Sequence, residues 1–397
     1  METICHVITK LELGGAQEVA LYAVSHLERT RFRPVLVAGA GGLLTEEAGR
    51  IPGVQTVILP SLGRRIHALS DLIALCKLIA LFRRLRPAVV HTHSSKAGVL
   101  GRWAAWFARV PVIIHTVHGF GITPAQPVWL RRLFVLLERM TGWVTTHWIA
   151  VAKADVERGR RWGLFRDNVS VVRPGIDPRP FRRALEPAAR RRLREEFGAG
   201  PGHCLVGTVA CLKPQKAPED FVLVANRLCE ALPHARFVLI GDGELRPRVE
   251  ALVRENGLEG LVRLAGWRRD VDRAMQSFDA LLLTSRWEGL PRVILEAATA
   301  GLPIVATRVG GVEEVLEGNP RARLCEAGDI EGLAAGLGEL LRGNGSGGGP
   351  TAGTGWSLPE EFHIEEMVKQ YQSLYDRLLS QERAKLLPGS MGPAPQS

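Results

Sequence analysis

"DALLLTSRWEGLPRVILEAATAGLPIVAT", residues 279–307, is the stretch that decides the fold. It opens with a short apolar strand, passes through a loop into a segment with helical spacing of apolar residues, and closes with a second apolar strand. Pro291 suits the first turn of the helix, and Gly301 suits its end. A strand–helix–strand unit of this kind predicts neighbouring parallel strands in an α/β sheet.

Glu288 and Glu296 are the only acidic residues between positions 285 and 307. A buried carboxylate is costly unless another group pairs with it or hydrogen-bonds to it. If the whole segment between them were helical, the two would lie about 12 Å apart, which is comparable with the reach from ribose to sugar in a nucleotide-sugar. They therefore either have partners inside the protein or hold opposite ends of such a ligand.

The same alternation of strands and helices continues along nearly the whole chain. Thirteen short apolar runs are too many for one compact sheet, so we expect two doubly wound parallel sheets. A Pro- and Arg-rich segment places the boundary between domains 1–185 and 186–362. A flexible Gly-rich insert is expected at 343–355, a final helix at 363–385 and a disordered tail at 386–397.

The composition is that of a globular protein with a large core. The chain has 397 residues, of which 46% are hydrophobic and 23% charged. Its six cysteines lack Cys-x-x-Cys spacing, which favours reduced thiols in a cytoplasmic protein. The N-terminus starts directly as a strand, so no signal peptide is expected. The most apolar helical stretch, 69–85, is too short and too charged to span a bilayer.

The positive charge is concentrated in the first half of the chain. The net charge is +10, and residues 1–190 hold 27 Lys and Arg against 13 Asp and Glu. Such a basic half suggests an anionic partner such as nucleic acid, anionic lipid or a phosphorylated substrate, or else an arginine-rich composition without a partner. Because the chain has no recognised nucleic-acid motif, we do not expect a nucleic-acid partner.

Several residues follow strands at the edge where ligands of open α/β sheets bind. Gly15 opens a helix whose free amide groups suit phosphate, although glycine pairs also serve as simple turns. Lys216 precedes a helix and can meet phosphate as a point charge, although lysines there are often only solvated. His118 and Gly241 also follow strands, where the ordinary alternatives are a packed histidine and a tight turn.

The pair Asp270 and Asp272 resembles the Asp-x-Asp metal motif of some sugar transferases. Here it opens a helix, which favours an N-cap at Asp270 and a first-turn acid at Asp272. We therefore expect no metal site.

Taken together, these segments resemble the family 4 retaining glycosyltransferases of the GT-B fold over nearly the whole chain. The most specific match is the Glu-x7-Glu motif, which reads "EGLPRVILE" and is flanked by "TSRW" and "ATAGLPIVATRVGGVEEVL". Supporting matches are "LELGGAQ", "HTHSSKAGVLGR", "HTVHGFG", "VVRPGID", "LKPQKAPEDF", "LIGDGELR" and "LAGWRRDV". The resemblance implies two Rossmann-like domains that face a cleft, with the C-terminal helix crossing back onto the N-terminal domain.

The resemblance also implies roles for five residues. Glu288 would contact the donor sugar and stabilise the reacting centre, and Glu296 would hydrogen-bond the ribose. Lys216 would neutralise the diphosphate, and Gly15 would bring backbone amides close to it. His118 would hydrogen-bond the donor sugar or its phosphate. Glu288, His118 and Lys216 are thus the expected catalytic residues.

Further positions carry over to the donor and acceptor sites. The donor-binding set would also include Cys211, Gly241, Trp267, Arg268, Gly289 and Leu290, and Gly310 and Gly311 would line the donor cleft. The acceptor-binding set would be His93, Lys96 and Arg102. The family pattern usually has an arginine where this chain has Cys211, so Lys213 or Arg286 would have to substitute for that cation.

The resemblance further implies retaining, metal-independent transfer of a hexose-type sugar from a nucleotide-diphosphate sugar, without a cofactor. The acceptor would be a glycan or a polyprenyl-diphosphate-linked sugar, as in the assembly of lipopolysaccharide, exopolysaccharide and other surface polysaccharides. A cytoplasmic protein that contacts the anionic inner face of the membrane would fit the basic and aromatic segments of the first half. The base and sugar of the donor stay open.

Three alternatives remain at this point. A nucleotide-sugar 2-epimerase has a similar two-domain architecture but does not display this Glu-x7-Glu context. A non-catalytic protein could use the basic half only for binding. A degenerate transferase would be consistent with Cys211.

Overall fold

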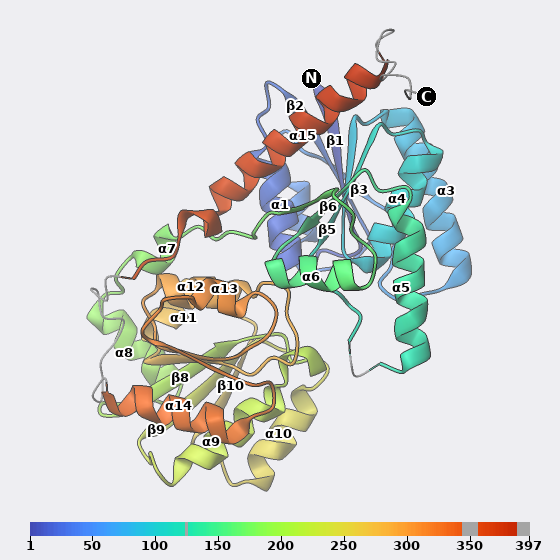
Figure 1. The fold of residues 1–397 in the computed structure, drawn as a ribbon. Coiled ribbons are helices and arrows are strands. Elements are labelled where there is room, and N and C mark those ends of the chain that lie inside the picture. Colours follow the sequence, from blue (N-terminus) through green and yellow to red (C-terminus); the bar gives the residue numbers. More distant parts are fainter. Residues whose placement is uncertain (124–125, 344–355, 387–397) are drawn as a thin grey trace, which may run out of the picture. The chain divides into compact units, whose positions relative to one another are not determined.

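The computed structural model describes residues 1–123, 126–343 and 356–386. The chain divides into two compact units: unit 1 is Met1–Pro174 with the segment that begins at Ile364, and unit 2 is Gly175–His363 (Figure 1). Apart from Gly343 and Leu386, the expected insert at 343–355 and the expected tail at 386–397 lie outside the described residues.

Unit 1 contains a seven-stranded sheet in the order β3-β2-β1-β4-β5-β6-β7, with all neighbouring strands parallel. The strands are β1 (Glu2–Ile8), β2 (Phe32–Ala38), β3 (Gln55–Ile58), β4 (Val89–His93), β5 (Val112–Val117), β6 (His147–Ala150) and β7 (Val169–Val171). The helices are α1 (Gly15–His26), α2 (Thr45–Gly49), α3 (Ala68–Leu85), α4 (Ser95–Phe107), α5 (Val128–Gly142), α6 (Lys153–Arg161) and α15 (Ile364–Leu386). The direction of winding reverses between β1 and β4, which is where open α/β sheets bind ligands.

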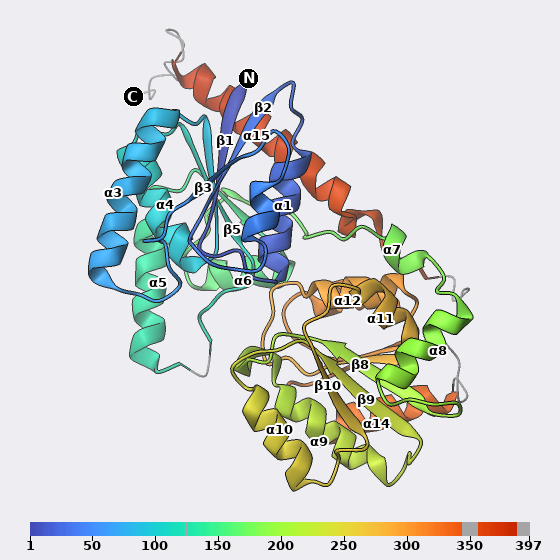
Figure 2. The same ribbon diagram turned by 180° about the vertical axis from the view of Figure 1, so that it is seen from behind.

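The two faces of this sheet are covered by different helices. Ile4 of β1 packs in one core cluster with residues of α1 and α15, whereas Cys5 packs in another with residues of α3 and α4. This alternation follows from the two-residue period of a strand. The C-terminal helix α15 therefore belongs to the core of unit 1, where it lies along the sheet with α1 (Figure 2).

Unit 2 contains a six-stranded parallel sheet in the order β10-β9-β8-β11-β12-β13. The strands are β8 (Cys204–Val209), β9 (Ala235–Ile240), β10 (Val262–Gly266), β11 (Ala280–Leu283), β12 (Ile304–Thr307) and β13 (Ala322–Cys325). The helices are α7 (Arg179–Arg182), α8 (Pro187–Glu196), η1 (Pro214–Lys216), α9 (Pro218–Cys229), α10 (Arg246–Glu255), α11 (Val271–Ser277), α12 (Arg292–Thr299), α13 (Val312–Leu316), α14 (Ile330–Gly343) and η2 (Glu360–Phe362). Here the winding reverses between β8 and β11, so both sheets have the doubly wound topology that the sequence predicts.

The structure refines two details of the sequence interpretation. The boundary falls after Pro174 rather than at 185, because α7 packs on α11 and α12 of unit 2. The helix α12 begins at Arg292, so Pro291 is its N-cap residue rather than a first-turn residue, whereas Gly301 lies just beyond the helix end with φ +71°, as the sequence predicts. Among the described residues, no helix combines the length and the apolar character that crossing a membrane requires.

Candidate functional site

A buried ion pair marks the carboxyl edge of the sheet in unit 2. Glu288 lies in the loop that follows β11, and Lys216 lies at the end of η1, in the segment that follows β8. Lys216 Nζ is 2.5 Å from Glu288 Oε1, and the Glu288 side chain is 6% exposed. Since β8 and β11 flank the reversal in strand order, the pair lies at the switch point of this sheet.

Two further side chains hold the carboxylate of Glu288. Ser285 Oγ donates to Oε1 at 2.6 Å, and Gln215 Nε2 donates to Oε2 at 3.1 Å. Both residues were missed by the sequence analysis, because they are neutral side chains in strand-end segments where only the charged residues and glycines were singled out. The cost of burying this carboxylate is therefore met by one cation and two neutral donors.

The backbone of the same loop is fixed on both sides. The Arg286 amide donates to the Gln215 carbonyl at 2.8 Å, and Thr307 Oγ1 at the end of β12 donates to the Ser285 carbonyl at 2.7 Å. The hydroxyl of Thr284 reaches the carbonyls of Lys216 and Ala217. These bonds tie the ends of three strands together, so Glu288 is held by a preorganised loop.

Gly310 is required at its position because it lies against this loop. Its φ is +56°, and a Cβ added there would lie 2.4 Å from the carbonyl oxygens of both Glu288 and Gly289. The next amide, from Gly311, donates to the Gly289 carbonyl at 2.6 Å. Residues after β12 therefore pack directly on the backbone that carries Glu288, as expected of residues that line the same site.

The other expected donor-binding residues of unit 2 follow the neighbouring strands. Gly241 follows β9 with φ +130°, and its Cβ would lie 2.0 Å from the Ala210 carbonyl oxygen, which shows how closely the loops after β8 and β9 approach. Cys211 follows β8 and is half-buried. Trp267 follows β10 and is 45% exposed. Leu290 is buried beside the Glu288 loop.

The side chain of Arg268 is already engaged by acidic residues. It hydrogen-bonds to Asp270 and Glu196, and these bonds raise the pKa of the guanidinium above its usual value. Asp270 is the N-cap residue of α11 and Asp272 lies in the first turn, as predicted, but Arg268 holds the Asp270 carboxylate in place of a capping bond.

Glu296, the second acid of the motif, lies within α12. Its Oε1 is 3.8 Å from Arg292 Nη2, one helical turn earlier, and both side chains are mostly buried. A separation of 3.8 Å is longer than a hydrogen bond, so this contact is a loose ion pair.

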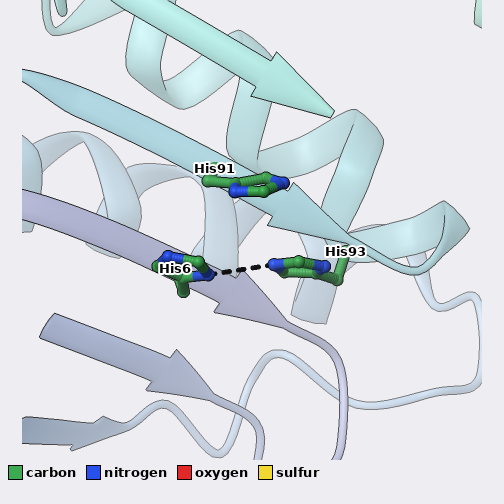
Figure 3. A group of neighbouring side chains, drawn as sticks. All are labelled: His6, His91 and His93. Atoms are coloured by element: carbon green, nitrogen blue, oxygen red, sulfur yellow. Dashed lines mark hydrogen bonds between the residues drawn. The ribbon is translucent and has the colours of Figure 1, made fainter. Parts of the chain in front are cut away.

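In unit 1, the expected residue His93 belongs to a buried group of histidines, and the expected residue His118, which is half-buried, lies next to this group. His6 of β1 lies beside His91 and His93 of β4 (Figure 3). His6 Nδ1 is 3.0 Å from His93 Nε2, and His93 Nδ1 is 2.9 Å from His118 Nε2. His91 contacts Tyr375 of α15 at 2.6 Å. The sequence analysis missed His6, His91 and Tyr375, although alternation along β4 places His91 and His93 on one face.

These histidines are neutral at neutral pH. Burial lowers the pKa of His6 to about 3 and that of His118 to about 4. It also lowers the pKa of His91 and His93 well below the usual value, with the neighbouring histidines adding to the shift. A neutral imidazole has one N–H donor and one acceptor nitrogen, so these residues act through hydrogen bonds rather than charge.

The remaining expected residues of unit 1 differ in their surroundings. Gly15 begins α1, as expected. Lys96, in the first turn of α4, pairs with Asp71 and donates to the Arg65 carbonyl. Both contacts keep the Lys96 side chain close to its own unit.

Arg102 was expected to bind the acceptor, and the structure instead gives it a structural role. Its side chain is fully buried and donates to the Gly98 carbonyl, Thr145 and Glu138. Its guanidinium also lies 4.6 Å from the ring centre of Trp148. These contacts join α4, α5 and β6. They use all three guanidinium nitrogens of Arg102, which an acceptor would otherwise have to bind.

Comparison with known proteins agrees with this architecture. A family model described as Glycosyltransferase Family 4 matches residues 13–179, and one described as Glycosyl transferases group 1 matches residues 203–343. The chain is 32% identical over 334 residues to the UDP-Gal:alpha-D-GlcNAc-diphosphoundecaprenol alpha-1,3-galactosyltransferase of Escherichia coli, covering 83% of this chain and 85% of that protein. A lipopolysaccharide core biosynthesis glycosyltransferase, LpsE of Rhizobium meliloti (strain 1021), is 33% identical over 113 residues, covering 28% of this chain and 33% of that protein.

A solved structure, Anabaena Alr3699/HepE in complex with UDP-glucose, has the same fold. It gives a TM-score of 0.74 at 20% identity and covers 97% of this chain and 100% of that chain. The relatives are transferases, which supports the transferase interpretation and not the 2-epimerase alternative. The chain belongs to glycosyltransferase family 4 and has the GT-B fold.

Proposed function

We propose that this glycosyltransferase moves a hexose-type sugar from a UDP-sugar to a polyprenyl-diphosphate-linked acceptor, with retention of configuration, during surface-polysaccharide assembly. The observation that carries the proposal is the buried Lys216–Glu288 pair at the switch point of unit 2. The Escherichia coli relative, whose name gives UDP-Gal as donor and a diphosphoundecaprenol-linked acceptor, supports the choice of donor and acceptor class.

In this mechanism Lys216 exchanges its partner: it leaves the Glu288 carboxylate and pairs with the diphosphate of the donor. The diphosphate of the donor attracts Lys216, whose ammonium group then stabilises the charge that develops as the nucleoside diphosphate leaves. Glu288 keeps its place because Ser285 and Gln215 still hold the carboxylate. Its negative charge then faces the sugar, where an oxocarbenium-like transition state carries positive charge, and the acceptor hydroxyl attacks on the same face.

We propose that transfer needs no metal ion and no cofactor. Lys216 and the dipoles of backbone amides supply the positive charge that a metal would otherwise supply. The Asp-x-Asp pair, Asp270 and Asp272, opens α11, and Arg268 holds the Asp270 carboxylate.

The test is a panel of UDP-, GDP- and ADP-sugars, scored by thermal shift. A donor at about 100 times its Kd should stabilise the protein by about 2.7 kcal/mol. The variant Glu296→Ala should lose most of this shift for the preferred donor, because losing hydrogen bonds to a carboxylate costs about 1.5–3 kcal/mol. If no nucleotide-sugar stabilises the wild type, the proposed donor site is wrong.

A matched control separates the ribose contact from a general loss of charge. Glu339→Ala removes a carboxylate of α14 that pairs with Arg323 and lies outside the carboxyl edge of the sheet. This variant should keep the full donor-induced shift.

The acceptor side of the proposal rests on an unusual helix of unit 1. One face of α5 is fixed to α4, because Glu138 binds Arg102 and Thr141 accepts a hydrogen bond from Trp103. The opposite face carries large apolar side chains in contact with solvent: Trp129, Leu133, Leu136, Leu137 and Met140, continued by Trp143 beyond the helix end. Trp129 is 67% exposed and Trp143 is 79% exposed. An apolar stripe of this size marks an interaction surface.

Basic residues lie next to this stripe. A pocket beside α5 has apolar walls from Ile122, Val128, Val135, Leu136 and Trp162 and basic walls from Arg131, Arg132, Arg139 and Arg161. Exposed tryptophan and leucine flanked by arginine is the pattern of helices that lie in the interface of an anionic membrane. We therefore propose that α5 docks on the membrane surface that carries the lipid-linked acceptor.

The variant Trp129→Ser/Leu133→Ser/Leu137→Ser should bind anionic vesicles at least about tenfold more weakly, because it removes apolar area that the membrane would bury. Sedimentation with vesicles of 30 mol% anionic lipid at low salt measures the effect. Leu43→Ser, which changes an exposed leucine elsewhere in unit 1, should bind like the wild type. If the wild type ignores these vesicles, the membrane proposal is wrong.

A further inference from the structure

We propose that Tyr375, His6 and His93 form one hydrogen-bonded chain that sets which ring nitrogen of His118 carries its proton. These three would be positioning residues for His118. The inference rests on the proposed function only where it assumes that His118 binds the donor. The hydrogen-bonded chain itself lies entirely within unit 1.

The chain is continuous in the structure. The hydroxyl of Tyr375 is 3.3 Å from His6 Nε2, His6 Nδ1 is 3.0 Å from His93 Nε2, and His93 Nδ1 is 2.9 Å from His118 Nε2. Each link uses the nitrogen of the ring that the previous link leaves free. Tyr375, His6 and His93 are fully buried, so water does not compete for these bonds.

The order of residues along the strands brings this chain together. His6 lies two residues after Ile4, and His91 and His93 follow Val89 at the same spacing, so all three face the side of the sheet that α15 covers. Tyr375 is part of the α15 core and approaches from that side. Figure 3 shows the rings of His6 and His93 placed end to end, with the nitrogens of the bond directed at each other.

Because the rings are neutral, the direction of donation in one hydrogen bond determines the direction of donation in the next. A neutral imidazole that accepts at one nitrogen must carry its proton on the other. If the Tyr375 hydroxyl donates to His6, then His6 donates to His93, His93 donates to His118, and His118 carries its proton on Nδ1. If the direction is reversed, all three histidines carry the proton on Nε2 and His118 Nδ1 becomes an acceptor.

The ligand then selects one of the two directions. Among the described residues, none is bonded to His118 Nδ1. Phosphate oxygens only accept hydrogen bonds, so a bound diphosphate requires the arrangement with the proton on Nδ1. Tyr375 can supply the donor at the far end of the chain, because its oxygen can accept from His91 Nδ1 while the other nitrogen of His91 bonds to Thr116. A residue of the C-terminal helix is thereby linked to the hydrogen bond that His118 makes.

A metal site formed by His6, His91 and His93 fits the geometry less well. Their nitrogens lie within 4.8 Å of one another. However, the rings of His6 and His93 are nearly parallel at 13°, and their facing nitrogens already share a hydrogen bond. Both nitrogens of His91 are also bonded, to Tyr375 and Thr116. A tetrahedral metal needs lone pairs that converge on one point.

The test reads the tautomers directly. In full-length protein labelled with 15N-histidine, long-range 1H–15N spectra should show His6, His93 and His118 in the same tautomer, and saturating UDP should place all three protons on Nδ1. Signals are assigned by single His→Gln substitutions. If ligand-free protein gives different tautomers for these three residues, the chain does not exist. If UDP does not bind while the shared tautomer is seen, only the proposed donor site fails.

Tyr375→Phe and Tyr371→Phe are a matched pair, because each removes one buried tyrosine hydroxyl and the two positions lie one helical turn apart. Tyr375→Phe should mix the tautomers of His118 and lower kcat/KM for the donor about 3- to 10-fold, the loss expected for one hydrogen bond. Tyr371→Phe should leave the His118 spectrum unchanged. The proposal is overturned if Tyr375→Phe leaves that spectrum unchanged, or if equimolar Zn²⁺ shifts the signals of His6, His91 and His93 together.

Discussion

Glu288→Gln is expected to lower kcat for sugar transfer by about 10²–10³-fold, with little change in KM for the donor. Glutamine keeps the size of the side chain and can still bond to Ser285, but it removes the negative charge that faces the transition state in the proposed mechanism. Loss of one preorganised electrostatic contact has an effect of this size in other enzymes. Steady-state transfer from the donor selected by thermal shift measures both constants.

The same substitution should also lower the free energy of unfolding by about 1–3 kcal/mol, because Lys216 loses its partner in a mostly buried position. Asp220→Asn is the matched control. Asp220 is a buried carboxylate that pairs with Arg286 between α9 and the Glu288 loop. Its substitution should lower stability and leave kcat within a few-fold. Full activity in Glu288→Gln would contradict the proposed role of the carboxylate.

The fold was accessible from the sequence because parallel strands buried on both faces read as uninterrupted apolar runs. All thirteen predicted runs correspond to strands. The unit boundary was predicted too late in the chain, because the segment that contains α7 looks like a Pro- and Arg-rich linker. Gln276 of α11 donates to the Pro180 carbonyl in that segment, and such a contact becomes visible only once the chain has folded.

The site could be predicted in part. Glu288 and Lys216 were identifiable because both follow strands, and strand ends of a parallel sheet share one edge. Their direct contact was not identifiable, since it depends on β8 and β11 being neighbours. Of the two explanations offered for a buried Glu288, the structure shows the internal partner, and the ligand stays part of the proposed function.

Arg102 shows where sequence reasoning was misled. A basic residue beside tryptophans in an amphipathic segment resembles a binding surface, yet α4 turns Arg102 into the core, where Glu138 neutralises it. The histidine chain shows the opposite error. His118 was recognisable at a strand end, but Tyr375 and His6, from opposite ends of the sequence, meet only through the packing of α15 on β1.

Lys216→Met is the second substitution with a large expected effect, a fall in kcat/KM of about 10²-fold or more, because the departing diphosphate loses its nearest cation. By itself the variant also leaves Glu288 buried without a cation, so its stability should fall. The double variant Lys216→Met/Glu288→Gln separates the two effects, since it removes both charges at once. Its free energy of unfolding should exceed the value expected from adding the single losses by about 0.5–3 kcal/mol.

Transfer by the double variant should nevertheless remain as low as in the worse single variant. Urea unfolding of the four proteins gives the coupling energy, and steady-state assays on the same samples give kcat/KM. Recovery of both stability and transfer in the double variant would show that the pair serves only the fold. Recovery of stability alone is expected, because Lys216 and Glu288 neutralise each other in the folded protein, whereas in the proposed mechanism they act on different parts of the donor.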